Sequence, residues 1–435
     1  MDKYSSIKKI GCLLIVSAYC SVAYGQLPAP VVEPPPVVPT IPGVPPAVEV
    51  PRGVERFALA DAIRVGVSRH PQIRAMNASY NAALTKHYGL EESASRGAFL
   101  LPDMKYRKTQ SEMALLAAQA ELRQAEFEVT FGVIRSYYTV VYAKQQAKVA
   151  ADLVEQLEVY LEQVRKIVNS KNGGIRGITK DTEDKLVIII SEAKGKYFDA
   201  VTGVKKSQAL LREAMGYGNE IAVDAADELL PAVEADLTKE VILGHALNRR
   251  GEIVLSRIGA DVSRLEICAQ WSRRLSIYMT TYANAGDIHA RSVPLTTRDP
   301  EYKPGGFNPE MPDRLIGSRE TRTNTAKFYA DRAQAVADQA KNLIILETDV
   351  AFTRWEDANK KVALFKDASK AAKEMISRQR EAAGGTLTKE DLLTNEIAAT
   401  KAFASYNEAL FEQIIALANL ERVTSGGVSI NFPGR

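Results

Sequence analysis

The sequence of 435 residues has few of the residues from which catalytic and metal sites are made. It holds only four histidines and three cysteines. Cys12 and Cys20 lie in a segment that we predict to be cleaved, which leaves Cys268 as the single cysteine of the mature chain. No two histidines have the i, i+4 spacing of a helical metal site. We therefore expect no disulfide framework, no metal site and no bound cofactor.

Proline is missing from two long stretches of the chain. Of the 19 prolines, ten lie between Pro28 and Pro51 and five lie between Pro294 and Pro312. Only Pro231 interrupts residues 103–293, and residues 313–431 contain none. Because proline interrupts helices, this distribution predicts a mainly α protein with a proline-rich leader and one proline-rich insertion.

The N-terminus has the layout of a secretory signal peptide. Lysines precede an apolar run from Ile10 to Val22, and small residues at Ala23 and Gly25 mark a cleavage site after Gly25. A membrane anchor is the alternative, but the run is shorter than the ~20 residues that a spanning helix needs. We assign residues 1–25 to the signal peptide and residues 26–56 to an extended proline-rich leader.

The net charge gives no support for a nucleic-acid partner. The full sequence carries a formal charge of +3. Removal of the signal peptide takes away three lysines and one aspartate and leaves +1. A nearly neutral mature chain lacks the basic excess that nucleic-acid binding requires.

After the leader the sequence describes one helical unit twice. Residues 57–84 and 237–264 align, and each predicts an amphipathic helix, a short break at His70-Pro71 or Arg250-Gly251, and a second helix. Each copy closes with a leucine-rich helix that stops at a glycine, at Gly216 and at Gly426. We therefore divide the chain into a first repeat at 57–236, a second repeat at 237–427 and a C-terminal tail at 428–435.

Very long antiparallel helices are predicted within each repeat. Thr109 begins a capping box, and Gly173-Gly174 is the next helix-breaking signal, which gives about 60 residues or ~90 Å of helix. A second capping signal at Thr388 predicts a tight hairpin at Gly384-Gly385. Three apolar heptad positions recur in the first repeat, and a stripe that wide predicts packing against several neighbours in a bundle or wall. Their members are Ala150, Leu157 and Val164; Leu153, Tyr160 and Ile167; and Val154, Leu161 and Val168.

Two groups of residues resemble ligand or catalytic sites, and each has a structural alternative. The aromatic residues Tyr137, Tyr138, Tyr142 and Trp355 have helical spacing, which is more typical of packing than of ligand stacking. Glutamates such as Glu91 and Glu92 lie on charged helix faces, where solvation explains them. The sequence has no G-x-S-x-G, P-loop, HExxH or CxxC motif, so we predict no enzyme.

Over Phe57 to Gly426 the sequence resembles the TolC-like outer-membrane efflux proteins. The duplicated long-helix unit, the glycine-led turns at Gly174 and Gly385 and the closing leucine-to-glycine stretches carry this resemblance, together with one opening pattern. That pattern consists of Leu59, Ala62, Ile63, Gly66, Val67, His70, Pro71 and Ile73.

The resemblance implies a homotrimer that acts as a passive exit duct of a tripartite efflux or type I secretion system. In such proteins the long helices form a hollow periplasmic cylinder, an α-barrel, topped by a transmembrane β-barrel in the outer membrane. The implied partners are a periplasmic adaptor, or membrane fusion, protein, an inner-membrane transporter and outer-membrane lipid. The implied location is the outer membrane, with a large periplasmic portion.

The resemblance also implies where the adaptor docks and the duct is gated. The glycine-led turns form the periplasmic tip, and the matching residues are Gly174, Thr179, Lys180, Asp181, Gly385, Thr388, Lys389 and Asp391. Lys180 occupies a place where the family pattern has an aspartate, which weakens the case for a carboxylate gate. The alternative is that these residues only cap helices and form turns.

The sequence departs from the family where membrane hairpins should be. Residues 97–108 are too few for a hairpin of two ~10-residue strands. The insertion at 273–322 has room and alternates apolar and polar residues over 275–283, but its prolines suit a small or degenerate β hairpin. Two functions therefore remain open: the exit duct, and a barrel-less periplasmic scaffold or adaptor-binding protein that forms no pore.

Overall fold

The computed structural model describes residues 53–97, 102–169, 180–273, 281–282, 311–381 and 389–435. The chain divides into two units, residues 1–50 and 51–435. The predicted signal peptide and most of the predicted leader lie outside the described residues, so the fold below is that of the second unit.

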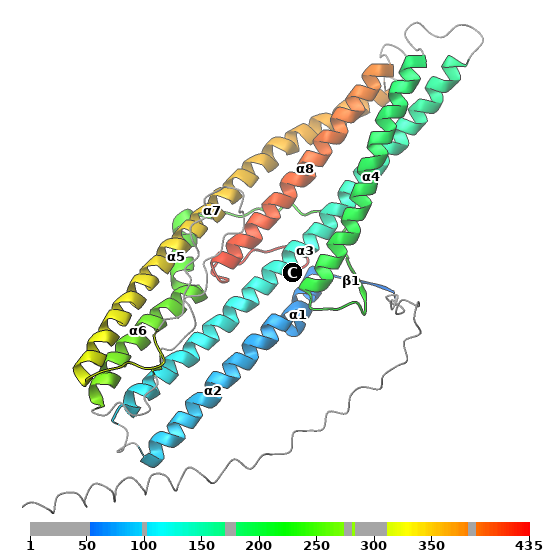
Figure 1. Ribbon diagram of the computed structural model, residues 1–435. Coiled ribbons are helices and arrows are strands. Elements are labelled where there is room, and N and C mark those ends of the chain that lie inside the picture. The colour runs from blue at the N-terminus through cyan, green and yellow to red at the C-terminus, as the bar shows by residue number, and fades with distance from the viewer. Residues whose placement is uncertain (1–52, 98–101, 170–179, 274–280, 283–310, 382–388) are drawn as a thin grey trace, which may run out of the picture. The chain divides into compact units, whose positions relative to one another are not determined.

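The described chain is built mainly from eight helices, as the proline distribution predicts (Figure 1). Their bounds are α1 Leu59–Arg69, α2 Pro71–Gly97, α3 Met104–Val168, α4 Lys180–Ala214, α5 Lys239–Arg249, α6 Gly251–Ser272, α7 Arg319–Glu381 and α8 Lys389–Val423. The helices α3 and α7 have 65 and 63 residues, so each is about 95 Å long.

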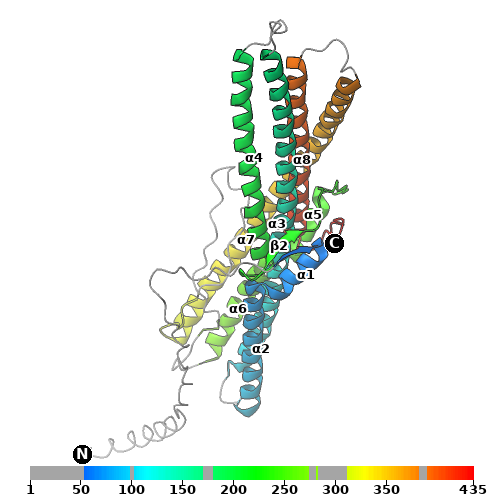
Figure 2. The ribbon, with the colours of Figure 1, turned by 90° about the vertical axis from the view of Figure 1, so that its right-hand side faces the viewer.

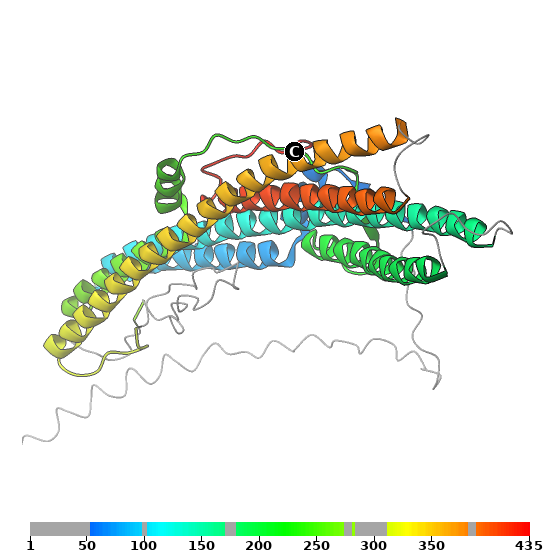
Figure 3. The ribbon, with the colours of Figure 1, turned by 90° about the horizontal axis from the view of Figure 1, so that it is seen from above.

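The long helices lie side by side in two sets of four that share α3 and α7. Toward one end the neighbours follow the order α4, α3, α8, α7, and toward the other end the order α2, α3, α6, α7. Figure 2 shows α4 continuing along the wall beyond the region where α2 packs on α3. Seen from above, in Figure 3, α3 and α8 run together between α4 and α7. Because α3 contacts five helices, α1, α2, α4, α6 and α8, its apolar stripe has to be wide, as the heptads predict.

The duplicated helix–break–helix units are confirmed. The first helix of each unit ends at Arg69 or Arg249, and the next begins at Pro71 or Gly251. Proline suits a first helical position because the amide hydrogen it lacks would have no helical acceptor there. The closing glycines of both repeats have positive φ, +73° at Gly216 and +68° at Gly426, which is the left-handed conformation that ends helices.

Two short strands form a parallel pair that the sequence does not predict. The strand β1, Val54–Phe57, pairs with β2, Ala222–Ala225, with Val54 opposite Ala222. Lys144 on α3 donates to Asp224 of β2 at 2.7 Å and ties the pair to the helices. The strand β1 crosses the boundary that we drew between the leader and the first repeat at residue 57.

Two predicted helix starts need correction. Helix α3 begins at Met104 rather than at Thr109, whose hydroxyl donates to the Lys105 carbonyl inside the helix at 3.3 Å. Helix α7 begins at Arg319, inside the predicted insertion. The alternating segment 275–283 lies almost entirely outside the described residues. The described parts of the insertion contain no strand, so the predicted β hairpin is not seen in them.

The main core lies where α1, α3, α4, α7 and α8 meet the β pair and the C-terminal residues. The residues 428–435, which we predicted to be a tail, belong to it: Val428, Ile430 and Phe432 are buried there. Tyr137 and Tyr138 are fully buried, with ring centroids 5.5 Å apart, so the packing interpretation of these aromatics is confirmed. Within the described residues, no helix combines the length and the apolar character needed to cross a bilayer.

Candidate functional site

The predicted docking and gating residues fall at the ends of the two long hairpins. Lys180 and Asp181 begin α4, and Lys389 and Asp391 lie in the first turn of α8. Gly174, Thr179, Gly385 and Thr388 lie outside the described residues. The free ends of α3, α4, α7 and α8 lie at the same end of the helical unit (Figures 1 and 2). The structure therefore brings the described residues of both groups to one end.

An ionic clamp closes the end of the first hairpin. Glu183 on α4 accepts a hydrogen bond from Lys180 at 2.7 Å and another from Arg165 on α3 at 3.1 Å. The Glu183 side chain is largely buried, whereas Asp181 is exposed. The hydrogen bond from Lys180, followed by the one from Arg165, holds the pKa of Glu183 below its usual range. Glu183 in turn raises the pKa of Lys180.

Below the clamp an apolar cluster joins α3 to α4. Leu157, Leu161 and Val164 from α3 pack against Leu186 and Ile190 from α4. Three of these residues belong to the predicted heptads. The packing of this apolar cluster therefore holds α3 and α4 together. The charged residues of the clamp lie beyond it, at the helix ends.

A hollow of about 970 Å³ lies midway along the helices, between α3, α4, α7 and α8. Its apolar lining includes Phe131 and Phe411, and its polar lining consists mainly of charged side chains. Lys361 lies 3.0 Å from Asp357 and 3.1 Å from Glu412, so this rim of the hollow holds paired charges. The charged side chains of this lining balance one another, so the hollow has little net charge.

A buried chain of charges leads from this hollow into the protein. Arg422 on α8 lines the hollow and donates to Glu128 at 2.9 Å and to Glu347 on α7 at 2.7 Å. Glu347 also pairs with Arg250, which is fully buried between α5 and α6. Burial alone would lower the pKa of Arg250, but the charges of Glu252 and Glu347 raise it by more than burial lowers it. The chain therefore fixes α3, α6, α7 and α8 relative to one another.

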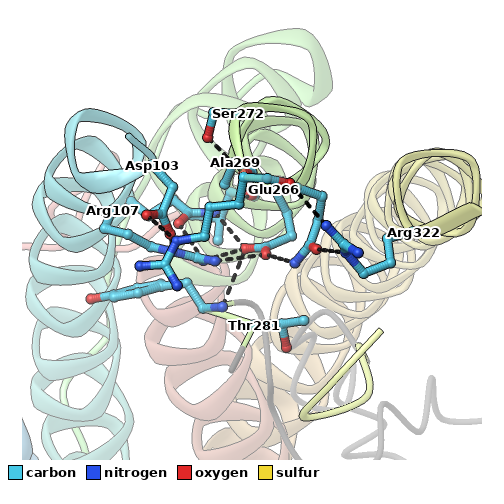
Figure 4. Close-up of polar contacts among 12 residues, drawn as sticks. Asp103, Arg107, Glu266, Ala269, Ser272, Thr281 and Arg322 are labelled. Atoms are coloured by element: carbon cyan, nitrogen blue, oxygen red, sulfur yellow. Dashed lines mark hydrogen bonds and ion pairs between the residues drawn. The ribbon is translucent and has the colours of Figure 1, made fainter. Parts of the chain in front are cut away.

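A second buried network lies at the other end of α3, where α6 ends and α7 begins (Figure 4). Glu266 on α6 accepts two hydrogen bonds from Arg107 on α3, at 2.5 and 2.9 Å. Burial lowers the pKa of Arg107, but Glu266 and then Asp103 raise it further than burial lowers it. The backbone amide of Tyr282 also donates to Glu266, at 3.2 Å. This network holds the described residues of the insertion against α6.

Sequence reasoning missed both networks. Their arginines and glutamates have the same helical spacing as solvated surface charges, and contacts between helices far apart in the chain leave no local signal. Each described carboxylate in the two networks is paired with an arginine, which suits a structural role. Among the residues of the described ranges, no group of three or more histidine, cysteine or acidic side chains could hold a metal ion.

Comparisons with known proteins place the fold. No family model matches the sequence, and no curated protein matches it significantly. Among solved structures, the open-state MtrE outer-membrane channel of Neisseria gonorrhoeae is 16% identical, with a TM-score of 0.63 over 88% of this chain and 96% of that one. The chain has the TolC-like fold.

Two further channels of this TolC-like fold are similar at low identity. The outer-membrane protein VceC of Vibrio cholerae is 12% identical, with a TM-score of 0.61 over 85% of this chain and 96% of that chain. The CmeC outer-membrane channel of Campylobacter jejuni is 11% identical, with a TM-score of 0.60, covering 85% and 86% of the two chains. The predicted fold class is confirmed: a mainly α, internally duplicated TolC-like fold.

Proposed function

We propose that this protein is a passive, non-enzymatic exit duct at the bacterial outer membrane, which connects to an inner-membrane transporter through a periplasmic adaptor. The observation that carries the proposal is the match of the whole helical unit to outer-membrane channels, over 88% of this chain and 96% of MtrE. The hollow between α3, α4, α7 and α8, with the paired charges at its rim, is consistent with a path along the helices.

Closure into a homotrimeric ring is the first part of the proposal. Helices α4 and α7 are the outer members of their set of four, and both expose apolar side chains. On α7, Phe328, Leu346 and Leu364 recur about five helical turns apart and therefore share one face. Packing of the α7 face of one copy against the outer helix of the next would repeat around a closed ring. Near Leu364 that outer helix is α4, which exposes Ile188 and Phe198, and near Phe328 it is α2.

The oligomer can be tested with one charge on this face. Leu364 is 66% exposed, so Leu364→Asp should leave the fold intact and weaken the ring, because a carboxylate would be buried between copies. The measurement is the mass of the purified protein in detergent by sedimentation velocity. Lys366→Asp, on the opposite side of the same helical turn, is the control. A monomeric wild-type protein would contradict the trimer.

Adaptor docking and gating at the hairpin ends form the second part. We assign them to Gly174, Thr179, Lys180 and Asp181 in the first hairpin, and to Gly385, Thr388, Lys389 and Asp391 in the second. Asp391→Ala or Lys389→Ala should change leak conductance more than Lys360→Ala, a matched change at an exposed site on α7. Equal effects would leave these residues as helix caps and turn residues.

The duct itself is tested by conductance in planar bilayers. The mature protein, purified in detergent, should give discrete conductance steps, and these should disappear in the Leu364→Asp variant if the pore needs the ring. A wild-type protein that stays in the soluble periplasmic fraction and gives no conductance would overturn the proposal.

One observation favours a second function, a periplasmic scaffold or adaptor-binding protein that forms no pore. Helix α2 ends at Gly97 and α3, which packs against it, begins at Met104, so only six residues connect the two helices. This leaves no room for a membrane hairpin in the first repeat. Fractionation separates the two functions, because a scaffold would be released with the periplasm and a duct would remain with the outer membrane.

A further inference from the structure

The end of α6 and the start of α7 carry two exposed apolar residues and a half-buried arginine that the duct proposal leaves without a role. Trp271, in the last turn of α6, is 52% exposed, and the Arg319 guanidinium lies over its ring, 4.0 Å from the centroid. Ile316, just before α7, is 87% exposed, the largest fraction of any large apolar side chain in the described residues. We call Trp271, Ile316 and Arg319 the α6–α7 platform.

The platform is held firmly, although its side chains face outward. Arg322 is almost fully buried and donates to two backbone carbonyls, those of Arg273 and Gly317, each at 2.9 Å. In the sequence, Arg273 follows Trp271 by two residues and Gly317 follows Ile316 directly. One guanidinium therefore fixes the backbone next to both exposed apolar side chains.

Neighbouring apolar residues show that the exposure of Ile316 is not a consequence of loose packing. Leu315 and Met311 are buried in a cluster with Val262 of α6 and Ala326 of α7. Ile316 therefore points away from a well-packed segment. Exposing a large apolar side chain on a rigid backbone is unfavourable in water, so this position suits contact with something outside the described chain.

The chemistry of the platform matches a lipid surface. Tryptophan is enriched at membrane interfaces because its ring is apolar and its N–H is polar, and arginine there reaches toward phosphate groups. In residues 271–273 and 311–332, Arg322 is buried and Arg273 is paired with Asp103. The other charged side chains are four basic and three acidic ones, and among the basic ones Arg314 and Lys327 are exposed. With two exposed apolar side chains, the platform is far smaller than the ~800 Å² per partner of a stable protein interface.

We propose that the α6–α7 platform rests on the membrane surface, with Trp271 and Ile316 in the interfacial layer and Arg319 bound to anionic phosphate headgroups. The proposal rests on the exit-duct function, because it requires the end of α6 and α7 to face the membrane. This end lies opposite the hairpin ends to which we assign adaptor docking (Figures 1 and 2).

The test uses the tryptophans of the chain as reporters. The sequence has only two, and Trp355 is 6% exposed in the core, so a change in the Trp271 environment dominates any response to lipid. Vesicles of phosphatidylethanolamine and phosphatidylglycerol, added to the mature full-length protein, should shift the emission to the blue and protect it from acrylamide quenching. Trp271→Phe should abolish both changes while leaving the Trp355 signal.

Variants separate the apolar and charged contributions to vesicle binding. Trp271→Ala should weaken binding about tenfold, and Arg319→Gln about fivefold on anionic vesicles but not on phosphatidylcholine vesicles. Leu229→Ala and Arg378→Gln, matched changes at exposed sites away from the platform, should have no effect.

Three outcomes would overturn the proposal. Trp271 quenching that is unchanged by vesicles would show that the platform does not reach lipid. Protection from quenching in lipid-free trimers would show that a second copy covers it. Equal losses in the platform and control variants would show that binding is not local. A protein that conducts and fractionates with the outer membrane, but keeps Trp271 accessible, would refute the platform alone and leave the duct in place.

Discussion

The two long hairpins, α3–α4 and α7–α8, bury side chains of different size near their ends. In the first hairpin, α3 and α4 bury Leu157, Leu161 and Ile190 near the end, beneath the ionic clamp of Glu183. In the second, up to residue 379 of α7 and from residue 394 of α8, where the structure describes burial, the buried residues at similar heights are small: Ser369 and Ala372 on α7, and Ala399 on α8. Both pairs of helices are long and closely packed, so the difference lies in how much apolar surface each end buries.

This difference predicts unequal local stability. Each leucine buried in the first hairpin contributes about 1.5–3 kcal/mol of transfer free energy, and an alanine contributes much less. Segments with few buried apolar contacts open first. We therefore expect the end of the α7 and α8 hairpin to open more easily, which would suit it to the moving part of a gate.

The largest effect is expected when a leucine of the apolar cluster between α3 and α4 is shortened to alanine. Leu157 is 1% exposed, so Leu157→Ala should lower the opening free energy of the first hairpin by about 3 kcal/mol through lost burial and a cavity. Hydrogen exchange of the α3 and α4 amides measures this. Val159→Ala, on the exposed side of the same stretch with 54% exposure, should cost less than about 0.5 kcal/mol. If Leu157→Ala also loosens α7 and α8 equally, the two ends are not independent.

A smaller effect is expected when a larger side chain replaces one of the small buried residues between α7 and α8. Ala399 is 1% exposed, and Ala399→Leu should destabilise the second hairpin by about 1–3 kcal/mol, because the helices have no space for the added atoms. Ala398→Leu, an exposed neighbour, is the matched control. Exchange of the α7 and α8 amides reports the change. Stabilisation by Ala399→Leu would mean that the contact is loose, and the comparison of the two ends would need to be redrawn.

The parts of this fold that the sequence predicts are those with periodic signals. The absence of proline predicts α3 and α7, and the heptads containing Leu157, Leu161 and Val164 predict the buried face of α3. The breaks at His70-Pro71 and Arg250-Gly251 are confirmed because proline and glycine act locally on the backbone. A local signal of this kind, the cap at Thr388, also predicts the start of α8 at Lys389, where two of the candidate docking residues lie.

The parts that the sequence does not predict depend on contacts between distant segments. The strands β1 and β2 have only four residues each and lie more than 160 residues apart in the sequence. Strands this short show no alternation from which they could be predicted. The sequence predicts the start of α3 wrongly because Thr109 resembles a cap, whereas Asp103, the residue before the helix, accepts a hydrogen bond from the distant Arg273 at 2.6 Å. The resemblance singles out Lys180 but not Glu183, because only the fold brings Arg165 to Glu183.

The smallest effect is expected at the ionic clamp of Glu183. The pKa shifts of Glu183 and Lys180 determine how its contribution to stability changes with pH. The pKa of Glu183 in the folded protein lies below its value of about 4.3 in an unfolded chain, so the clamp is fully stabilising above that pH and its contribution is lost as the pH falls through the lower folded-state value. Lys180 has a raised pKa, so its contribution is complete below about pH 10.4 and is lost as the pH rises through the higher folded-state value.

Glu183→Gln should therefore make the first turn of α4 exchange faster at neutral pH and remove the additional loss of protection in acid. Asp184→Asn, whose side chain is 64% exposed, should leave the acid dependence unchanged. Amide exchange at the start of α4, followed from neutral to acid pH and corrected for the intrinsic rate, makes the measurement. Parallel acid profiles of wild type and Glu183→Gln would show that the clamp adds nothing, and the leucine core alone would then distinguish the two hairpin ends.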